Sequence, residues 1–333
     1  MASIKDVAER AGVSIASVSR VLNLSKPVAP ETRARVLNAV RELNYSIDQR
    51  ARALRLQKSS TLGLIVADVA NPFFGQVIRT IEAVTYRNGH DLFLCNSDED
   101  VERETFHLQA MRSQRIGGII LLPVSFSGAS IAPLLKNDIP VVCLDRRVDD
   151  FELDVVLVDN RAGGRMAAQA LFDAGHRRIA VVGASRTTPG RDRLTAFRDW
   201  LKSQGVDLAP ELVREGNYRE PGGYKETLAT LSLPEPPTAI FCVNHPMTLG
   251  AFGAIRDMGL SVPKDISLIG FDDPSWARFL DPPLTTIAQP TDQLGMSAAE
   301  MLIDRVAKRY TGAARSVMLQ PRFMQRGSIG RVR

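Results

Sequence analysis

The chain has 333 residues, of which 44% are hydrophobic and 24% charged, a composition typical of two or three folded domains rather than of a disordered protein. Its positive charge is concentrated at the start. Residues 1–60 hold eleven Lys and Arg against five Asp and Glu, a formal charge of +6, whereas the whole chain carries +5. The remainder is therefore close to neutral, and the basic N-terminal segment indicates a polyanionic partner.

The sequence also argues against export and membrane insertion. No apolar run approaches the ~18 residues that a membrane span needs, and the first residues are too polar for a signal peptide. The three cysteines, Cys95, Cys143 and Cys242, are odd in number and far apart. We expect buried free thiols rather than a disulfide framework or a zinc site. Together these features predict a cytoplasmic protein with no membrane partner.

The first predicted elements are two short amphipathic helices, over residues 4–11 and 15–23, joined by a tight turn. Gly12 can adopt a positive φ in that turn, and Ser14 can cap the second helix. Helix, glycine turn and helix is the arrangement of a DNA-binding helix-turn-helix. The apolar stripes predicted to face the core are Ile4, Val7, Ala8 and Ala11, then Ile15, Val18, Val21 and Leu22.

A third helix is predicted from Pro30 to about Leu43. Residues 47–56 follow, with three arginines and little to bury, and such a short stretch is not a stable helix alone in water. We expect it to order only against a partner, with residues 57–60 as a polar linker. The buried stripe of the third helix is predicted as Val36, Leu37, Val40 and Leu43.

From Thr61 onward, apolar runs of strand length alternate with helical stretches, which predicts buried parallel sheets built from βαβ units. The strands are too many for one sheet, so we expect two α/β lobes with a ligand cleft between them. The domains are then 1–58 and 59–333, with the lobe boundary near 160 and a return near 290. Predicted strands are 62–67, 91–95, 118–122, 141–144, 155–158, 179–182, 239–243, 267–271 and 316–320. Predicted helices are 74–88, 102–114, 162–174, 195–204, 222–231 and 248–258.

Several of these segments resemble the LacI/GalR family of bacterial transcription regulators. The headpiece motif is Ile4-Lys-Asp-Val-Ala followed by Ala11-Gly-Val-Ser14, then Val18-Ser-Arg-Val-Leu-Asn23 and Leu43-Asn-Tyr45. The later part agrees in Asn71-Pro-Phe-Phe74, Gly175-His-Arg177, Ser267-Leu-Ile-Gly-Phe-Asp272 and Pro283-Leu-Thr-Thr-Ile-Ala-Gln-Pro290. The resemblance covers essentially the whole chain and implies a headpiece followed by a two-lobed domain like a periplasmic binding protein.

The resemblance implies a homodimer that binds near-palindromic, double-stranded operator DNA, with the second helix of each headpiece in the major groove. Arg20 can bond a guanine, and Ile15 and Ala16 can meet thymine methyl groups. Contacts that position the headpiece on phosphates are also expected. The residues expected at base edges are Ile15, Ala16, Ser17 and Arg20, and those expected at phosphates are Lys5, Ser14, Ser19, Asn23 and Thr32.

Residues 48–56 match the hinge helix of the family, which enters the minor groove as a pair. Leu54 fits the side chain that wedges a base step open, Ala51 allows close approach, and Arg55 is expected to contact DNA. The alternative is that Leu54 is a linker residue that packs on the core. Ile47 stands where the family usually has Pro, so the start of the hinge is less sharply defined.

A second resemblance is to periplasmic sugar-binding proteins, in particular the ribose-binding protein. A sugar needs planar polar groups for its hydroxyls and aromatic faces for its C–H surfaces, and most of the matching residues follow predicted strands. Alternatively, Asp and Asn at strand ends cap helices, and Phe73 and Phe74 belong to the core. The expected effector-binding residues are Asn71, Phe73, Phe74, Asp145, Arg146, Arg193, Tyr218, Asn244, Asp272, Trp276 and Gln289.

The expected function is a repressor switched by a pentose, a hexose or a sugar acid, with no cofactor. A sugar acid is retained among the expected effectors because of three basic residues, Arg147, Arg186 and Arg191. The resemblance departs at His245, where relatives commonly have Asp. Trp276 either closes the pocket or only packs against the protein. A co-repressor-dependent regulator with a purine or nucleoside effector is the alternative. An enzyme is not expected, because the chain has no Walker loop, no dinucleotide fingerprint, no nucleophile elbow and no metal-ligand pattern. The headpiece argues against a transport protein.

Overall fold

The structure, a computed structural model, describes residues 2–23, 28–43, 45, 60–183 and 185–332. The chain divides into two compact units, Met1–Ser59 and Ser60–Arg333. Within the described residues, no helix has the length and apolar character needed to cross a membrane.

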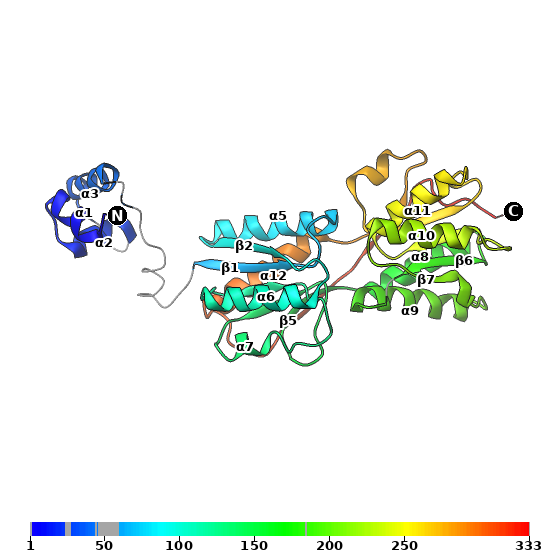
Figure 1. The fold of residues 1–333 in the computed structure, drawn as a ribbon, viewed down its shortest axis with the longest axis horizontal. Helices are drawn as coiled ribbons and strands as arrows, with labels where there is room; N and C mark the ends of the chain where they lie inside the picture. The colour runs from blue at the N-terminus through cyan, green and yellow to red at the C-terminus, as the bar shows by residue number, and fades with distance from the viewer. Residues whose placement is uncertain (1, 24–27, 44, 46–59, 184, 333) are drawn as a thin grey trace. The chain divides into compact units, whose positions relative to one another are not determined.

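The described residues of the first unit form three helices, α1 (Ile4–Ala11), α2 (Ile15–Asn23) and α3 (Pro30–Glu42), around one small core (Figure 1). The predicted stripes are correct except for two residues, because Ile15 and Leu37 are 40% and 36% exposed. Helices this short bury a narrow stripe, and Leu37 lies about 100° around α3 from the buried Val36. The buried side chains are Val7, Ala8, Ala11, Val18, Val21, Val36 and Ala39.

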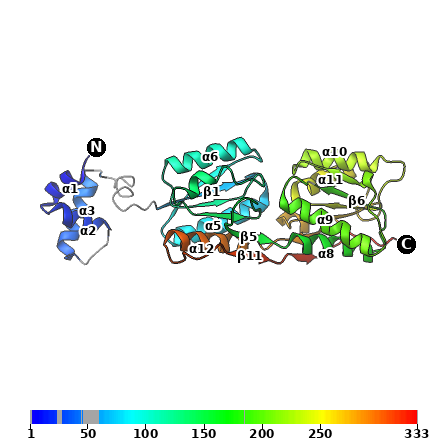
Figure 2. The same cartoon turned by 90° about the horizontal axis from the view of Figure 1, so that it is seen from below.

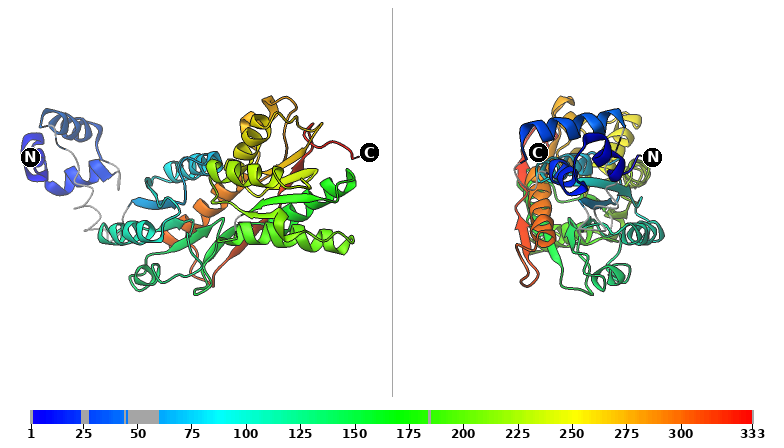
Figure 3. Two further views of the ribbon diagram at one scale, coloured as in Figure 1. Left: turned by 45° about the vertical axis from the view of Figure 1, so that its right-hand side comes forward. Right: turned by 90° about the vertical axis from the view of Figure 1, so that its left-hand side faces the viewer.

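The second unit contains two sheets of six strands each, in the orders β11-β5-β4-β3-β1-β2 and β12-β10-β9-β8-β6-β7. All of these neighbours are parallel except β10 and β12. The two-lobed α/β fold expected from the sequence is therefore confirmed (Figures 1 and 3). The first lobe holds β1 (Thr61–Val66), α5 (Pro72–Arg87), β2 (Asp91–Asn96), α6 (Val101–Ser113), β3 (Ile119–Leu121), α7 (Ala132–Leu135), β4 (Val141–Leu144), β5 (Asp154–Val158), α12 (Thr291–Val306) and β11 (Ser316–Leu319). The second holds α8 (Asn160–Asp173), β6 (Ile179–Gly183), α9 (Thr188–Ser203), η1 (Pro210–Leu212), β7 (Val213–Glu215), α10 (Glu220–Leu231), β8 (Ala239–Cys242), α11 (His245–Asp257), β9 (Ser267–Phe271), η2 (Ser275–Phe279), β10 (Thr285–Ala288) and β12 (Arg322–Met324).

Helices cover both faces of each sheet. In the first lobe α5 and α12 pack on one face, and α6 and α7 pack on the other (Figure 2). In the second lobe α8 pairs with α9, and α10 pairs with α11. Gly164 of α8 permits one of these close approaches, because an added Cβ atom would lie 2.3 Å from the carbonyl oxygen of Arg193 in α9. Burial on both faces explains why most strands are continuous apolar runs.

The chain crosses between the lobes three times, after β5, after β10 and after β11. The first two crossings lie at the positions that the sequence pattern indicates. The third was not predicted: after Leu319 the chain returns to the second lobe and adds β12, which pairs antiparallel with β10. The first and third connections are joined by a hydrogen bond from the Asp159 amide to the Leu319 carbonyl, 2.8 Å long.

Two expectations about burial were wrong in part. Strand β2 lies at the edge of its sheet, and its Phe93 and Leu94 side chains are 40% and 43% exposed. The sequence of an edge strand cannot be distinguished from that of a buried central strand when the outer face of the edge strand is also apolar. Cys95, on the same strand, is consequently only half-buried, whereas Cys143 and Cys242 are buried; all three are free thiols.

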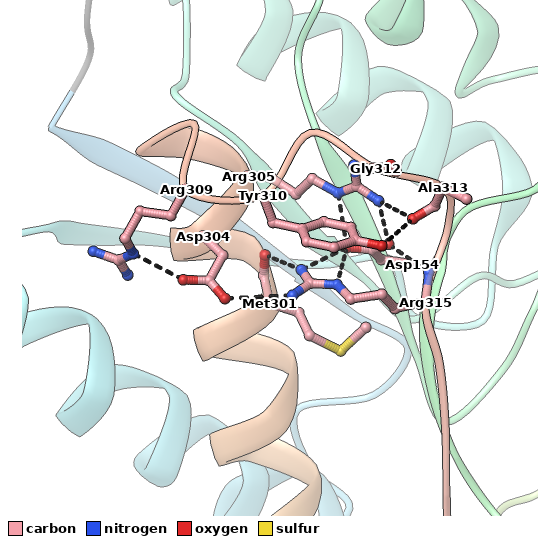
Figure 4. A network of polar contacts seen from close by, with 9 residues as sticks. All are labelled: Asp154, Met301, Asp304, Arg305, Arg309, Tyr310, Gly312, Ala313 and Arg315. Carbon is pink, nitrogen blue, oxygen red and sulfur yellow. Dashed lines mark hydrogen bonds and ion pairs between the residues drawn. The ribbon is translucent and has the colours of Figure 1, made fainter.

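A buried carboxylate joins three separate segments of the first lobe. Asp154, 1% exposed at the start of β5, binds Arg305 of α12 and Arg315 before β11, at 2.7 and 2.9 Å (Figure 4). The ring of Tyr310 lies 4.6 and 4.2 Å from the two guanidinium groups. Burial alone would raise the pKa of Asp154, but the hydrogen bonds from both arginines outweigh it and hold this pKa below its usual value.

We expect Asp154→Asn to lower the free energy of unfolding of the second unit by about 3 kcal/mol at neutral pH, because it leaves two guanidinium groups without their counter-charge. The loss should shrink as the pH falls below the usual pKa of an aspartate, where the wild-type carboxyl also gains a proton. Urea unfolding at several pH values measures both effects.

Asp149→Asn is the matched control. Asp149 pairs with Arg147 at 3.9 Å, and both side chains are more than half exposed. This change should cost less than about 0.5 kcal/mol. Equal losses for the two variants would contradict the role given to Asp154.

Candidate functional site

The turn between α1 and α2 is built from local hydrogen bonds. Gly12 ends α1 at φ 62°, and its N–H donates to the carbonyls of Ala8 and Glu9. Ser3 and Asp6 form a capping box at the start of α1. The Ser14 hydroxyl accepts from the Ser17 N–H at 3.1 Å, so it caps α2 as expected.

One face of α2 lies on the surface. Ile15, Ala16 and Arg20 are exposed there, and Ser17 and Ser19 are half-buried. An exposed isoleucine at a helix start fits a contact surface better than the core position first assigned to Ile15. Of the expected phosphate contacts, Lys5 and Ser14 are exposed and Thr32 is half-buried. The Asn23 side chain, and Ala51, Leu54 and Arg55 of the predicted hinge, lie outside the described residues.

In the second unit, the carboxyl ends of strands from both sheets border one pocket. Its empty volume is about 430 Å³, including the solvent space at its open mouth. Every residue expected to bind the effector lines this pocket except Trp276. Asp68, Glu99, Thr187 and Pro189 also line it and were missed. Asp145 directly follows β4, and Glu99 lies three residues beyond the end of β2, so the place of Glu99 shortly after a strand was the available signal. The lining is Asp68, Asn71, Phe73, Phe74, Glu99, Asp145, Arg146, Thr187, Pro189, Arg193, Tyr218, Asn244, Asp272 and Gln289.

Two of the asparagines also cap helices, the alternative role considered from the sequence. The Asn71 Oδ1 accepts from the Phe73 N–H at 3.1 Å, and the Asn244 Oδ1 accepts from the Met247 N–H at 3.1 Å. The Asn244 amide nitrogen donates to the Tyr218 carbonyl. Capping and pocket lining are therefore compatible, because the same strand-to-helix turn presents the side chain to both.

The first lobe contributes a charged cluster. Arg146 donates from both terminal nitrogens to the Glu99 carboxylate, at 2.8 and 2.6 Å, and to the carbonyl of Pro123. Its Nε lies 3.8 Å from the Asp145 Oδ2. Burial would lower the pKa of Arg146, but Glu99 and Asp145 outweigh it and raise this pKa. Burial raises the pKa of Asp145, against the pull of Arg146 and Arg193.

The second lobe contributes Arg193, which is held from three sides. Its Nε donates to the Asn160 Oδ1 and its Nη1 to the Val243 carbonyl, both at 2.7 Å, and its guanidinium lies 3.5 Å from the centre of the Phe271 ring. Nearby, the Asp272 Oδ1 accepts from the Gln289 amide nitrogen at 2.5 Å. The guanidinium is thus fixed in position before any ligand arrives.

Within the part of the chain that the structure describes, three buried polar atoms of the pocket residues have no hydrogen-bond partner: Asp145 Oδ1, Arg146 Nε and Gln289 Oε1. Native proteins seldom bury such atoms unpaired, because each costs about 1–3 kcal/mol. Two acceptors and a donor on residues that line one pocket are the kinds of group that bind ligand hydroxyls.

Four of the pocket residues have left-handed backbone conformations. Glu99, Asp145, Tyr218 and Asp272 have φ values of 56°, 64°, 63° and 74°. Each costs on the order of 1 kcal/mol for a residue with a side chain, and such strain concentrates where function fixes a side-chain direction. The strain supports the assignment of this pocket as the functional site.

The sequence also singled out residues that lie elsewhere. Trp276 packs on the core of the second lobe and donates its indole N–H to the His245 Nε2 at 3.1 Å. The Arg191 guanidinium lies 4.9 Å from the Phe126 ring centre, and neither Arg186 nor Arg147 lines the pocket. Among the described residues, no group of His, Cys, Asp and Glu could hold a metal ion.

Comparison with protein families matches both units. Residues 3–48 match the model of bacterial regulatory proteins, lacI family, and residues 168–329 match the periplasmic binding protein-like domain. The chain is 36% identical over 332 residues, covering 99% of both chains, to the HTH-type transcriptional repressor PurR of Pasteurella multocida.

Solved structures give the same result. The lac repressor dimer bound to operator and an anti-inducer has a TM-score of 0.87 and 26% identity, over 98% of each chain. A LacI family transcriptional regulator from Enterococcus faecalis with bound ribose has a TM-score of 0.74 and 31% identity, over 82% of this chain and all of its own. With its helix-turn-helix and two-lobed domain, the chain belongs to the LacI family, as a DNA-binding transcriptional repressor rather than an enzyme.

Proposed function

We propose that this repressor binds a near-palindromic operator as a homodimer and is switched by a neutral monosaccharide, an aldopentose of the ribose type, bound in the cleft. The exposed end of α2 reads bases, and the two lobes close on the sugar. The sugar acts through a difference in affinity between the operator-binding and released states, which is the only way a ligand shifts such an equilibrium. The hinge helix predicted over 48–56 is the segment we expect to transmit the change.

Two unpaired atoms on neighbouring residues, Asp145 Oδ1 and Arg146 Nε, are the observation that carries the sugar assignment. One atom is a buried acceptor and the other a buried donor, and both are unpaired at the pocket wall. Two neighbouring sugar hydroxyls can each accept and donate, so a diol satisfies both atoms at once. The Phe73 and Phe74 rings, 5.0 Å apart and at 62° to one another, supply apolar faces for the C–H bonds.

The balance of charge favours a neutral sugar over a sugar acid. Arg146 is already neutralised by Glu99, and Arg193 is engaged by internal acceptors. The pocket lining has more acids than bases, with Asp68, Glu99, Asp145 and Asp272 against Arg146 and Arg193. A ligand carboxylate would meet net repulsion here.

A purine or nucleoside that strengthens operator binding is the alternative. A flat base needs broad apolar walls, whereas this pocket presents carboxylates, amides and two rings set edge to face. The solved regulator with bound ribose, 31% identical to this chain, also favours the sugar.

Thermal unfolding against a panel of aldopentoses, aldohexoses, sugar acids, nucleosides and purines tests the proposal. A ligand at about 100 times its Kd adds about 2.7 kcal/mol to the free energy of unfolding, which raises Tm by several degrees. We expect the shift with one neutral pentose. Asp145→Asn should weaken its binding about 10- to 100-fold, because a hydrogen bond to a charged group is lost.

Asn tolerates the positive φ at position 145, so this variant should fold. Asp149→Asn is the exposed control, and both variants should bind operator as the wild type does without sugar. A shift with purines alone would reject the sugar assignment and leave the family assignment intact.

For the headpiece, we expect Arg20→Ala to weaken specific operator binding by about 1–3 kcal/mol, because a side chain bonded to a guanine edge is lost. Sugar binding should be unchanged. Gel-shift titration and calorimetry measure the two affinities separately, and an equal loss of both would reject the base-reading role of α2.

The two lobes are also joined across the mouth of the cleft. The Arg219 Nη2 of the second lobe lies 2.7 Å from the Asp98 Oδ1 of the first, and each residue is the chain neighbour of a pocket residue, Tyr218 or Glu99. We expect Asp98→Asn and Arg219→Gln each to weaken sugar binding up to about 5-fold, in proportion to an exposed ion pair. The double variant should bind the sugar no more weakly than either single variant does. The loss of affinity should become smaller at high salt concentration. Additive losses that salt leaves unchanged would exclude a closing role for the pair.

A further inference from the structure

A second pocket adjoins the effector cleft and shares one wall with it. Phe73, Asp272 and Gln289 line both pockets, and His245 and Thr291 are among the residues that line only the second. His245 is the first residue of α11 and is 5% exposed.

Trp276 determines which nitrogen of His245 carries the proton. An indole N–H can only donate, so the His245 Nε2 that receives it at 3.1 Å must be an unprotonated acceptor. The proton of the neutral imidazole therefore sits on Nδ1. The two rings are 5.2 Å apart and inclined at 46°, which holds the imidazole in this orientation.

The resulting Nδ1–H is buried and has no partner. The same is true of the Gln289 Oε1, whose amide nitrogen is bound to Asp272. The lining of the second pocket therefore includes two residues with an unpaired atom, a donor on His245 and an acceptor on Gln289. A hydroxyl group, which accepts and donates together, is the simplest group that satisfies both.

We propose that His245, fixed in one tautomer by Trp276, forms with Gln289 a second polar subsite that takes one hydroxyl group of the effector and so selects among sugars. The inference rests on the proposed sugar effector. The pair also supports the first pocket, because the backbone N–H of His245 donates to the Asp272 Oδ2 at 3.1 Å.

The surroundings keep the imidazole neutral. Burial lowers the pKa of His245, while the carboxylates of Asp272 and Glu220 oppose this shift. Asp273 is a lesser influence because Arg326 neutralises it at 2.6 Å. The bond from Trp276 adds to the effect of burial, since only the neutral ring can accept it. Removing that bond should therefore move the pKa of His245 upward.

The tautomer can be read directly, without any sugar. The chain has four histidines, so side-chain ¹⁵N spectra of the labelled full-length protein can be assigned by substitution. We expect the His245 Nδ1–H tautomer to persist below the usual pKa of a histidine side chain in the wild type. In Trp276→Phe, which keeps the aromatic bulk, His245 should show mixed tautomers and take up its proton at higher pH. A wild-type Nε2–H tautomer or a cation at neutral pH would overturn the assignment.

The subsite is tested by pairing protein variants with deoxy sugars. In the wild type, removing one particular hydroxyl from D-ribose should weaken binding about 2- to 10-fold beyond removal of the others, in keeping with a neutral hydrogen bond. His245→Leu should abolish that selective penalty, and His245→Asn, which retains a donor, should preserve part of it. His107→Leu, on α6 of the first lobe, is the control and should leave the pattern unchanged.

The outcomes separate this inference from the proposed function. If the penalties for all deoxy sugars are the same in wild type and His245→Leu, the sugar site stands and the subsite is rejected. If the wild type binds no sugar, the proposed effector and the subsite fail together, and the tautomer is still decided by the spectra alone.

Discussion

Everything in the second unit depends on the polarity of its two sheets. Parallel strands all end at the same edge, and the two carboxyl-terminal edges border one pocket. Residues at or just beyond the ends of four strands reach that pocket, so Asp145, Asn244, Asp272 and Gln289 meet although they are far apart in sequence. The fold thereby collects charged groups that no local segment could bring together.

Most of the collected charged groups are then bonded to other groups of the protein. Glu99 holds Arg146, internal acceptors hold Arg193, and Asp272 is bound by an amide and a backbone N–H. Only a few atoms are left unpaired, and these define the chemistry of the ligand. Because the arginines are oriented before binding, a ligand does not have to order them, which lowers the entropic cost of association.

The sequence predicted most of the architecture because its signals are local. The capping serine, the glycine at φ 62° and the continuous apolar strands each report on their own neighbourhood. The exposure of a side chain depends on which distant segments pack against it, and local sequence does not show this. Leu37 and the outer face of β2 were therefore assigned wrongly to the core. The place of Trp276 behind His245 rests on a hydrogen bond between side chains 31 residues apart, which no periodicity records. The role of Glu99 was missed because its partner, Arg146, lies 47 residues further along the chain.

The three crossings between the lobes restrict how those lobes can move. Parallel connections, two of them bonded to one another between Asp159 and Leu319, resist sliding and leave rotation about the line that joins them. The first lobe then acts as a lever. Its sheet meets the cleft at one edge, and β1 begins with Thr61 at the opposite edge, on the far side of the strands. A small rotation at the cleft therefore displaces Thr61, near the start of the second unit, farther than it displaces the residues at the cleft. The length of the strands determines how much larger that displacement is.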